Sequence, residues 1–333
     1  MTGVCNLYTH LGKIQKNPFC KKQREYMNKI NILCSTDDNY VPYCGIMLTS
    51  LFENNKDLNL EVYLMCESLN EKNLNDLNLL SKKYGVNIQM IHMDNSIFKN
   101  CPIRPNDHVS LVAYYRLVAA DVLPEEVDKI LYLDCDMIVN GSIKNLYNTD
   151  ISEYAFGAVI DEDVFNDEKY SRLNYKKSYK YINTGVIIFN LEYWKKHNIA
   201  KECFEYISKY PDRIKLHDQD TINVVCRKQK KLLPIVYNFQ TGFLLTDLNF
   251  SKSVEDEIKS SSKSPVIIHY TGKNKPWMRY SQQPFRNLFL KYKKQSLWNK
   301  LPLIKNLNAK KIIRYYIYHF ILLIKNKRKY RRY

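Results

Sequence analysis

The chain has 333 residues, of which 45% are hydrophobic and 13% aromatic, so it can bury a sizeable core and is not globally disordered. Its net charge of +17 belongs to the C-terminal part, because the last acidic residue is Glu257 and 20 of the 51 Lys and Arg follow it. This asymmetry suits an anionic membrane surface or a nucleic acid as a partner, although a merely solvated charged tail has the same composition.

The cysteines and the chain ends indicate a cytoplasmic protein. The nine cysteines are an odd number, are scattered and form no CxxC pair, which is typical of reduced, buried thiols. Residues 1–28 lack the apolar core of a signal sequence and are interpreted as an irregular extension. The longest apolar stretch, 312–324, contains Arg314 and His319 and is too short to span a bilayer.

Strands and helices alternate in the first part of the chain. A strand beginning at Ile30 is followed by a helix over 46–54, a strand over 60–66, a helix over 71–84 and a strand over 87–91. This order predicts a parallel sheet with right-handed crossovers.

A second series of elements follows a loop that contains Pro102 and Pro105. The hydrophobic pattern predicts helices over 109–121, 194–207 and 221–226, and strands over 130–133, 155–160, 185–189 and 266–268. From Gln282 onward the pattern is helical, basic and aromatic, so we place a domain boundary near residue 280.

The strongest local signal is an apolar strand that ends in two carboxylates, Asp134 and Asp136, with Cys135 between them. In an extended strand residues i and i+2 point the same way, and ligands of open α/β sheets bind beyond the carboxyl edge. Oxygen ligands of this kind suit Mg²⁺ or Mn²⁺. The alternative is a solvated turn.

A second polar cluster follows the last predicted strand. His269 directly after that strand could complete the shell of a metal, and an imidazole favours Mn²⁺ over Mg²⁺. Gly272 permits close approach of the backbone to a phosphate, and Lys275 could place its charge there. The alternative is a core histidine followed by a turn.

A third cluster, Thr36-Asp37-Asp38-Asn39-Tyr40, lies at the end of the first strand and could hold and stack on a base. The alternative is an ordinary turn in which an Asp caps the next helix. Two further polar clusters, at 181–185 and 218–220, border predicted regular structure and could be purely structural.

The joint occurrence of these clusters resembles retaining glycosyltransferase family 8, the family of the bacterial lipopolysaccharide galactosyl- and glucosyltransferases and of glycogenin. The resemblance runs from about residue 31 to 277. Its motifs, in order, are Thr-Asp-Asp-Asn-Tyr at 36–40, Tyr-Arg at 115–116, Leu-Tyr-Leu-Asp-Cys-Asp at 131–136, Asn-Thr-Gly at 183–185, Asp-Gln-Asp at 218–220 and His-Tyr-Thr-Gly-Lys-Asn-Lys-Pro-Trp at 269–277.

The resemblance implies an α/β protein with the GT-A fold, a Rossmann-like nucleotide-binding mixed sheet with flanking helices, over residues 29–280. It implies Mn²⁺, with Mg²⁺ possible, on Asp134, Asp136 and His269, and UDP-galactose or UDP-glucose as the donor. The other implied donor-binding residues are Thr36, Asp37, Asn39 and Tyr40 at the uracil, Cys135 beside the metal ligands, Gly272 and Lys275 at the diphosphate, and Arg116, Asn183, Asp218 and Gln219 around the sugar.

Retention at C1 leaves the mechanism open between a nucleophile on the far face of the sugar and a front-face path. The best-placed residue corresponds to Gln219, a poor nucleophile, so we favour the front-face path with Gln219 stabilising the positive ring. Asp218 is the rival candidate for direct chemistry, and Arg116 completes the set that we assign to catalysis.

The basic tail favours a membrane. Residues 291–333 hold 14 basic groups and no acid, interleaved with aromatic and apolar side chains, which suits an anionic headgroup region. We therefore expect residues 281–333 to be amphipathic and to attach the enzyme peripherally to the inner face of the cell membrane, near a saccharide or glycolipid acceptor. No nucleic-acid partner is expected. The alternatives are a nucleic-acid-binding protein and a glycogenin-like self-glucosylating primer.

Overall fold

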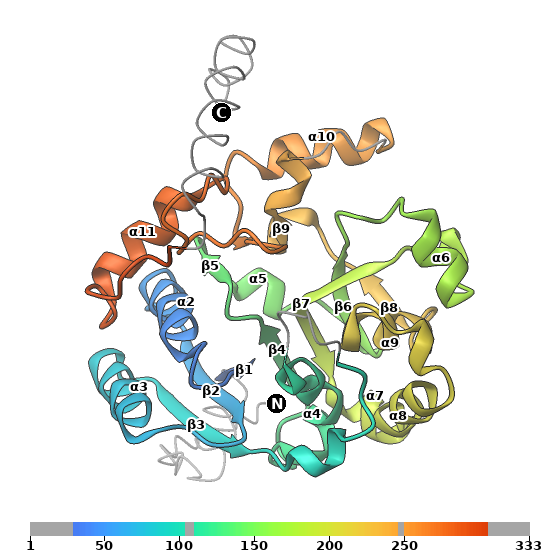
Figure 1. Cartoon of the computed structure of the whole chain (residues 1–333), viewed down its shortest axis with the longest axis horizontal. Helices are drawn as coiled ribbons and strands as arrows, with labels where there is room; N and C mark the ends of the chain where they lie inside the picture. The colour runs from blue at the N-terminus through green and yellow to red at the C-terminus, as the bar shows by residue number, and fades with distance from the viewer. Residues whose placement is uncertain (1–28, 104–109, 246–249, 306–333) are drawn as a thin grey trace, which may run out of the picture.

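A seven-stranded mixed sheet forms the centre of the structure (Figure 1). The computed structural model describes residues 29–103, 110–245 and 250–305. The strands lie in the order β3-β2-β1-β4-β7-β6-β8, with β3, β2, β1 and β4 parallel and β7 antiparallel to both its neighbours. Their bounds are β1 (Lys29–Ser35), β2 (Asn59–Cys66), β3 (Asn87–His92), β4 (Lys129–Leu133), β6 (Phe156–Ile160), β7 (Ile182–Asn190) and β8 (Lys230–Leu232).

A second, three-stranded sheet contains His269, the first residue of the last sequence motif. It has the order β5-β10-β9, with β5 (Met137–Val139), β9 (Phe239–Gln240) and β10 (Ile267–His269). Because β5 follows β4 after only the Asp134-Cys135-Asp136 turn, pairing of β10 with β5 brings a distant part of the chain to that turn. The antiparallel register places His269 opposite Met137.

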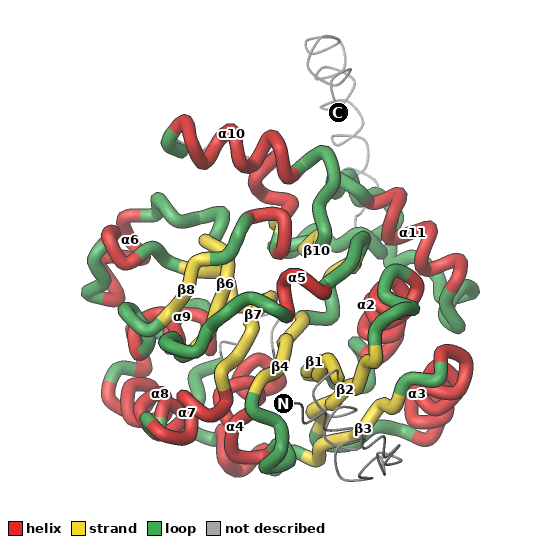
Figure 2. Tube along the Cα trace, turned by 180° about the vertical axis from the view of Figure 1, so that it is seen from behind, coloured by secondary structure: helices red, strands yellow, loops and turns green. Residues whose placement is uncertain are grey.

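Helices cover both faces of the large sheet. Figure 2 shows α2, α3 and α11 on one side of the strands and α4, α7 and α8 on the other. The helices are α2 (Val41–Glu53), α3 (Glu71–Tyr84), α4 (Ala119–Val122), α5 (Lys144–Tyr147), α6 (Asp167–Leu173), α7 (Leu191–Lys196), α8 (Ile199–Lys209), α9 (His217–Val225), α10 (Lys252–Ser261) and α11 (Arg286–Gln295). The 3₁₀ segments are η1 (Asn95–Phe98), η2 (Leu111–Val118), η3 (Lys177–Tyr179), η4 (Pro211–Arg213), η5 (Ile235–Tyr237) and η6 (Thr241–Leu244).

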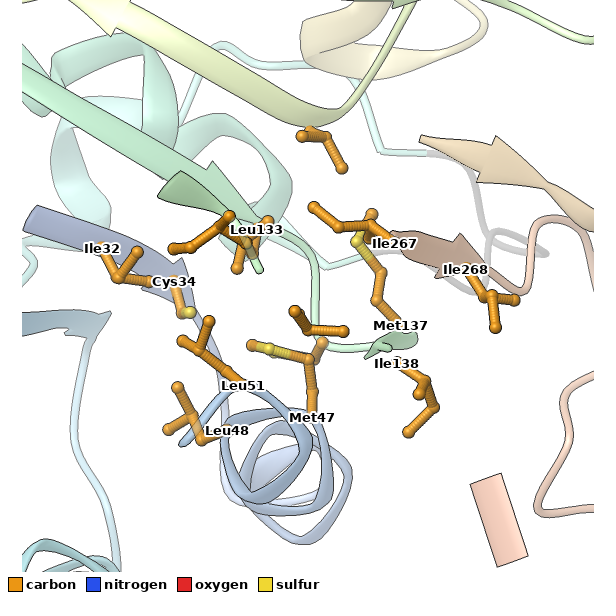
Figure 3. Packing of buried hydrophobic residues seen from close by; sticks show 14 of the residues in the cluster. Ile32, Cys34, Met47, Leu48, Leu51, Leu133, Met137, Ile138, Ile267 and Ile268 are labelled. Carbon is orange, nitrogen blue, oxygen red and sulfur yellow. The ribbon is translucent and has the colours of Figure 1, made fainter. Parts of the chain in front are cut away.

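Burial on both faces explains why the central strands are almost continuously apolar. Ile32 and Cys34 of β1 point into the cluster beneath α2, whereas Leu33 between them points into the cluster beneath η2 and α9. Figure 3 shows the first cluster, where Met47, Leu48 and Leu51 of α2 lie against β1, β4, β5 and β10. The sheet is therefore sandwiched, and its polar residues concentrate at its carboxyl edge.

The helix α3 has the start and stop signals that its sequence predicts. The side chain of Asn70 caps the helix by accepting a hydrogen bond from the backbone N–H of Asn73 at 2.9 Å. Gly85 ends it in the left-handed conformation, with φ of 65°. Leu77 and Leu80 are buried on one face, so the observed bounds agree with the predicted 71–84.

Two predicted helices differ from the structure in kind or continuity, and α2 and α9 begin five and four residues before the predicted 46–54 and 221–226. The predicted helix over 109–121 is mostly the 3₁₀ segment η2, in which all five residues from Tyr114 to Val118 are buried, a pattern without helical periodicity. The predicted helix over 194–207 is two helices, because Asn198 adopts a left-handed φ of 52° between α7 and α8. Asparagine tolerates that conformation and the helix cannot pass through it.

The first part of the basic C-terminal region packs against α2. Phe289 and Tyr292 of α11 are buried in the same cluster as α2, and Tyr292 Oη accepts a hydrogen bond from Asn54 at 2.7 Å. Trp298 lies directly over Gly45 of α2, where an added Cβ would be 1.9 Å from the indole ring. The packed body therefore includes residues beyond 280.

Other expectations about the ends of the chain fall largely outside the described residues. The extension 1–28 and residues 306–333 of the tail lie there. Within the described part, none of the helices has the length and apolarity of a membrane span. The seven cysteines of that part are free and buried, as expected for reduced thiols.

Trp298→Ala is expected to destabilise the protein by about 3 kcal/mol, because removing a buried indole from Gly45 leaves a cavity. Urea unfolding would measure the loss. Leu297→Ala is the control, since Leu297 is 39% exposed and should change the free energy of unfolding by less than about 0.5 kcal/mol. Equal stability of the two variants would contradict a structural role for the segment after α11.

Candidate functional site

The candidate site lies at the carboxyl edge of the large sheet. Asp134 follows β4 and Asp161 follows β6, while antiparallel β7 begins at the same edge with Asn183 and Thr184. The N-terminus of α9 adds Asp218 and Gln219 to this edge. Ligands of open α/β sheets bind at such an edge, and here it gathers polar groups from four parts of the chain.

Asp134, Asp136 and His269 form one cluster. One ligand atom from each lies within 4.8 Å of the others. His269 Nε2 is 3.3 Å from Asp136 Oδ1, close to the ~3 Å that separates adjacent ligands of an octahedral ion with bonds of about 2.1 Å. The predicted juxtaposition of the imidazole with both acids is therefore observed.

The donor set fits a divalent cation. Two carboxylates and one imidazole are suitable ligands for Mn²⁺ and leave coordination positions for a substrate. The Asp136 side chain is 14% exposed, and Lys275 Nζ contacts its Oδ2. Burial opposes ionisation of Asp136, but the adjacent Lys275 ammonium helps to hold the pKa of this carboxyl below its usual range. It is thus available as an anionic ligand.

Arg116 ties the metal-ligand cluster to the second half of the site. Its guanidinium donates to Asp134 Oδ1 at 2.8 Å and lies 3.2 Å from Asp218 Oδ2. It also donates to the carbonyl oxygen of Thr184 and lies 4.0 Å above the ring of Tyr132. With only 4% of its surface exposed, Arg116 acts as the internal counter-ion of two carboxylates.

Gln219 and Asp218 are held by one threonine. The backbone N–H of Thr184 donates to Gln219 Oε1 at 3.1 Å, and its hydroxyl donates to Asp218 Oδ2 at 2.9 Å. His217, just before them, has a left-handed φ of 48°, which turns the chain into α9. Burial raises the pKa of Asp218 to about 6, and Arg116 opposes this rise.

Asp161 is a central site residue that we did not predict. Its Oδ1 accepts from the buried Lys169 ammonium at 2.9 Å, and its Oδ2 accepts from Asn183 at 3.2 Å and Gln219 at 3.1 Å. An acid directly after the strand predicted over 155–160 was the available signal, since Asp134 follows its strand in the same way. Asn238, which contacts His269, had no such signal.

The turn after β1 has the hydrogen bonds of the alternative interpretation, a turn formed by an Asp side chain. Asp37 Oδ1 accepts from the backbone N–H groups of Asn39 and Tyr40, each at 3.0 Å, as a turn-forming Asp does. Thr36 is buried and Asn39 is exposed. Tyr40 lies edge-on to Trp277, with ring centroids 6.1 Å apart, so the first and last motifs meet here.

Three residues that we expect to contact the donor, Cys135, Lys275 and Gly272, differ in their surroundings. The Cys135 side chain is buried in the core, and its Sγ donates to the carbonyl oxygen of Ser35 at 3.2 Å, so only its backbone faces the site edge. Lys275 contacts Asp136 and the carbonyl oxygen of Tyr270. Gly272 has φ of 73° and open space around its Cα, so its conformation rather than crowding requires glycine.

The sequence comparison decides the family. The family model of glycosyl transferase family 8 matches residues 31–281. The chain belongs to glycosyl transferase family 8. Membership makes it a glycosyltransferase of the retaining type, and the family expected from the motifs is confirmed.

Relatives of this family 8 protein match it over most of its length. General stress protein A of Bacillus subtilis (strain 168) is 28% identical over 82% of this chain and 96% of its own. A putative glycosyltransferase of Haemophilus influenzae is 31% identical over 74% of this chain and 73% of its own. Lipopolysaccharide 1,2-glucosyltransferase of Escherichia coli is 28% identical over 87% of this chain and 84% of its own.

A solved structure confirms the fold of the family 8 domain. The galactosyltransferase LgtC, crystallised with donor and acceptor sugar analogues, superposes with a TM-score of 0.74 at 23% sequence identity. The match covers 84% of this chain and 98% of that one. The large mixed sheet with flanking helices is thus the predicted GT-A fold.

Asp218→Asn is expected to flatten the pH dependence of stability. With its pKa raised to about 6, Asp218 stabilises the metal-free fold at low pH, and this contribution is lost as the pH rises through 6. Between pH 5 and 7.5 the free energy of unfolding of wild type should fall by more than about 1 kcal/mol relative to that of Asp218→Asn. Urea unfolding at both values would measure this difference. Asp212→Asn, on the exposed η4, is the control, and parallel curves for wild type and Asp218→Asn would contradict the assignment.

Proposed function

We propose that this family 8 enzyme is an Mn²⁺-dependent retaining hexosyltransferase that moves galactose or glucose from a UDP-sugar to a saccharide acceptor of a cell-surface glycolipid or polysaccharide. The observation that carries the proposal is the cluster of Asp134, Asp136 and His269, joined through Arg116 to Asp218. The lipopolysaccharide glucosyltransferase among its relatives supports the acceptor class.

The metal end of the site supports departure of the nucleotide. Asp134, Asp136 and His269 would hold the cation, which when bound supplies Lewis-acid stabilisation to the leaving diphosphate. Lys275 adds a fixed positive charge beside Asp136, and the turn at Gly272 presents backbone groups near it. Such preorganised charges stabilise negative charge that develops in the transition state.

The sugar end supports a front-face path. Gln219 is an amide held by Thr184 and Asp161, so it is better suited to stabilise a positively charged ring than to attack C1. In this path the bond from C1 to the diphosphate breaks and the acceptor oxygen bonds to C1 on the same face. The acceptor proton then passes to the departing phosphate oxygen. Asp218, ion-paired with Arg116, recognises sugar hydroxyls.

The turn after β1 is the proposed base site. Asp37 uses Oδ1 within the turn, which leaves its other carboxylate oxygen for the uracil edge, and the exposed Asn39 side chain adds a second polar group. Tyr40 would stack on the base. Its edge-on contacts with Tyr43 and Trp277 hold the ring in place.

A donor screen tests the proposal. UDP-galactose, UDP-glucose and their N-acetyl forms are incubated with enzyme and Mn²⁺, and release of UDP is measured. We expect turnover with one hexose donor, loss on chelation, and a loss of about a hundredfold or more in kcat/KM for Asp136→Asn. Asp256→Asn on the exposed face of α10 should leave turnover unchanged.

The outcomes separate the parts of the proposal. Turnover that survives chelation would contradict metal dependence, and no turnover of any UDP-hexose would contradict the donor class. Intact-mass spectra of the same incubations address the mechanism. A glycosyl adduct on Asp218 or Gln219 would contradict the front-face path, and successive hexose additions to the protein would favour the self-glucosylating primer.

For residues 306–333 we propose attachment to an anionic membrane at the inner face of the cell membrane. This segment contains nine Lys and Arg, each contributing roughly 1 kcal/mol near such a surface. Deleting it should abolish flotation with anionic liposomes, whereas full-length protein should float with them and not with neutral ones. The deletion begins at 306 because the preceding segment is packed on α2. Flotation of the truncated protein would contradict the proposal, and salt-dependent RNA binding without turnover would favour the nucleic-acid alternative.

A further inference from the structure

The imidazole of His269 is held from the side opposite the acids by a chain of buried amides. Its Nδ1 is 3.1 Å from Asn238 Oδ1, and Asn238 Nδ2 donates to Asn183 Oδ1 at 2.9 Å. Asn183 Nδ2 in turn donates to Asp161 Oδ2 at 3.2 Å. Asn238 has no exposed surface, and it precedes β9, which pairs in parallel with β10. This series of hydrogen bonds therefore connects the proposed metal site to the proposed sugar site.

The orientation of Asn183 is fixed by two neighbours of opposite character. The Asp161 carboxylate, ion-paired with Lys169, can only accept hydrogen bonds, so it requires the NH₂ group of Asn183. The backbone N–H of Gly185 can only donate, and it lies 3.0 Å from Asn183 Oδ1. Reversing the amide would break both bonds, so Asn183 presents its oxygen to Asn238.

The proton on His269 follows from this order. Asn238 must use its NH₂ group toward the oxygen of Asn183, and it therefore presents Oδ1 to the imidazole. An acceptor at that position requires a proton on Nδ1. In the neutral ring Nε2 then carries the lone pair, and this is the nitrogen 3.3 Å from Asp136 Oδ1. The lone pairs of Nε2 and Asp136 Oδ1 repel each other at this separation, whereas a cation could bind both atoms.

Packing restricts the ring as well. A Cβ at Gly185 would lie 2.3 Å from His269 Cε1 and 2.7 Å from Met137 Cε, so the imidazole lies directly against Gly185 of β7. The ring cannot rotate toward that strand. Hydrogen bonding selects the nitrogen that is protonated, and the contact with Gly185 limits the direction in which the other nitrogen points.

We propose that Asn238 is a positioning residue that fixes His269 as the Nδ1–H tautomer, so that Nε2 presents its lone pair to the divalent cation. The inference rests on the proposed metal-dependent function, but the tautomer is a property of the metal-free protein. Outer-shell partners of metal-ligating histidines typically contribute a factor of 10 to 100 in metal affinity. Asn238 would contribute a factor of this size without touching metal or substrate.

The test begins with the tautomer. Long-range ¹H–¹⁵N spectra of metal-free, ¹⁵N-histidine-labelled protein, recorded at a pH high enough to keep the imidazole neutral, distinguish the two neutral tautomers, and His269→Gln identifies the signals of that ring. We expect the Nδ1–H form in wild type and appearance of the Nε2–H form in Asn238→Ala. Asn238→Asp keeps an acceptor toward Nδ1 and should retain the wild-type tautomer.

Mn²⁺ affinity without donor is the second measurement. The dissociation constant should rise 10- to 100-fold in Asn238→Ala. Asn55→Ala is the matched control, because Asn55 is equally buried but bonds only backbone groups of Leu51, Gly141 and Ile143. In Asn55→Ala the tautomer of His269 and the affinity for Mn²⁺ should match those of wild type.

Two results would overturn the inference. One is the Nε2–H tautomer of His269 in wild type, and the other is unchanged tautomer and Mn²⁺ affinity in a folded Asn238→Ala. Should Asn238→Ala fail to fold, loss of the Nδ1–H form in Asn238→Asp would count against it equally. A wild-type protein that binds no Mn²⁺ but shows the Nδ1–H form would refute the proposed metal dependence and leave the tautomer assignment standing.

Discussion

Charge balance among buried acids is the constraint on which the site depends. Aspartates meet at one sheet edge, where water is largely excluded, and each of the five discussed here is paired with a cation. Arg116 is shared by Asp134 and Asp218, while Asp161 is paired with Lys169. The remaining pairs are Asp136 with Lys275, and Asp220 with Arg172. The cations lie on η2, on α6 and in the loop after β10, away from the segments that carry their acids, so the ion pairs also tie these segments together.

The pairs are not equivalent, and their differences assign roles. Asp220 has no exposed surface and accepts from Tyr181 at 2.6 Å, from the backbone of Lys215 at 2.7 Å and from Leu216 at 2.8 Å. Its bonding capacity is consumed within the protein, so it anchors the start of α9. Asp134 is 26% exposed at its side chain and can accept further partners. Burial thus distinguishes Asp220, which stabilises the site from within, from Asp134, which can serve a ligand.

Much of the fold could be predicted because its signals are local. The apolar strand before Asp134, the capped helix α3 and the alternation of elements are all patterns of hydrophobicity and turn chemistry. The motifs at Asp134 and His269 could be linked through metal-ligand chemistry and the family resemblance, but not through any local pattern. The β5–β10 pairing that joins them is a contact between segments about 130 residues apart.

What could not be predicted depends on tertiary contacts. Asn238 lies in an irregular segment before a two-residue strand, and nothing near it in sequence indicates that it contacts His269. The irregular η2 was missed because a segment buried on all sides has no periodicity to read. The Asp161 position carried a usable signal, an acid after a strand, which became meaningful only beside Gln219 and Asn183.

The contact between Trp298 and Gly45 implies a constraint across the family. Because the indole occupies the space of any side chain at position 45, the two positions should covary among homologues. Relatives that lack an aromatic residue at 298 are free to accept alanine or serine at 45, where helix propensity favours them over glycine. The glycine within α2 is thus required by a segment more than 250 positions away in the chain.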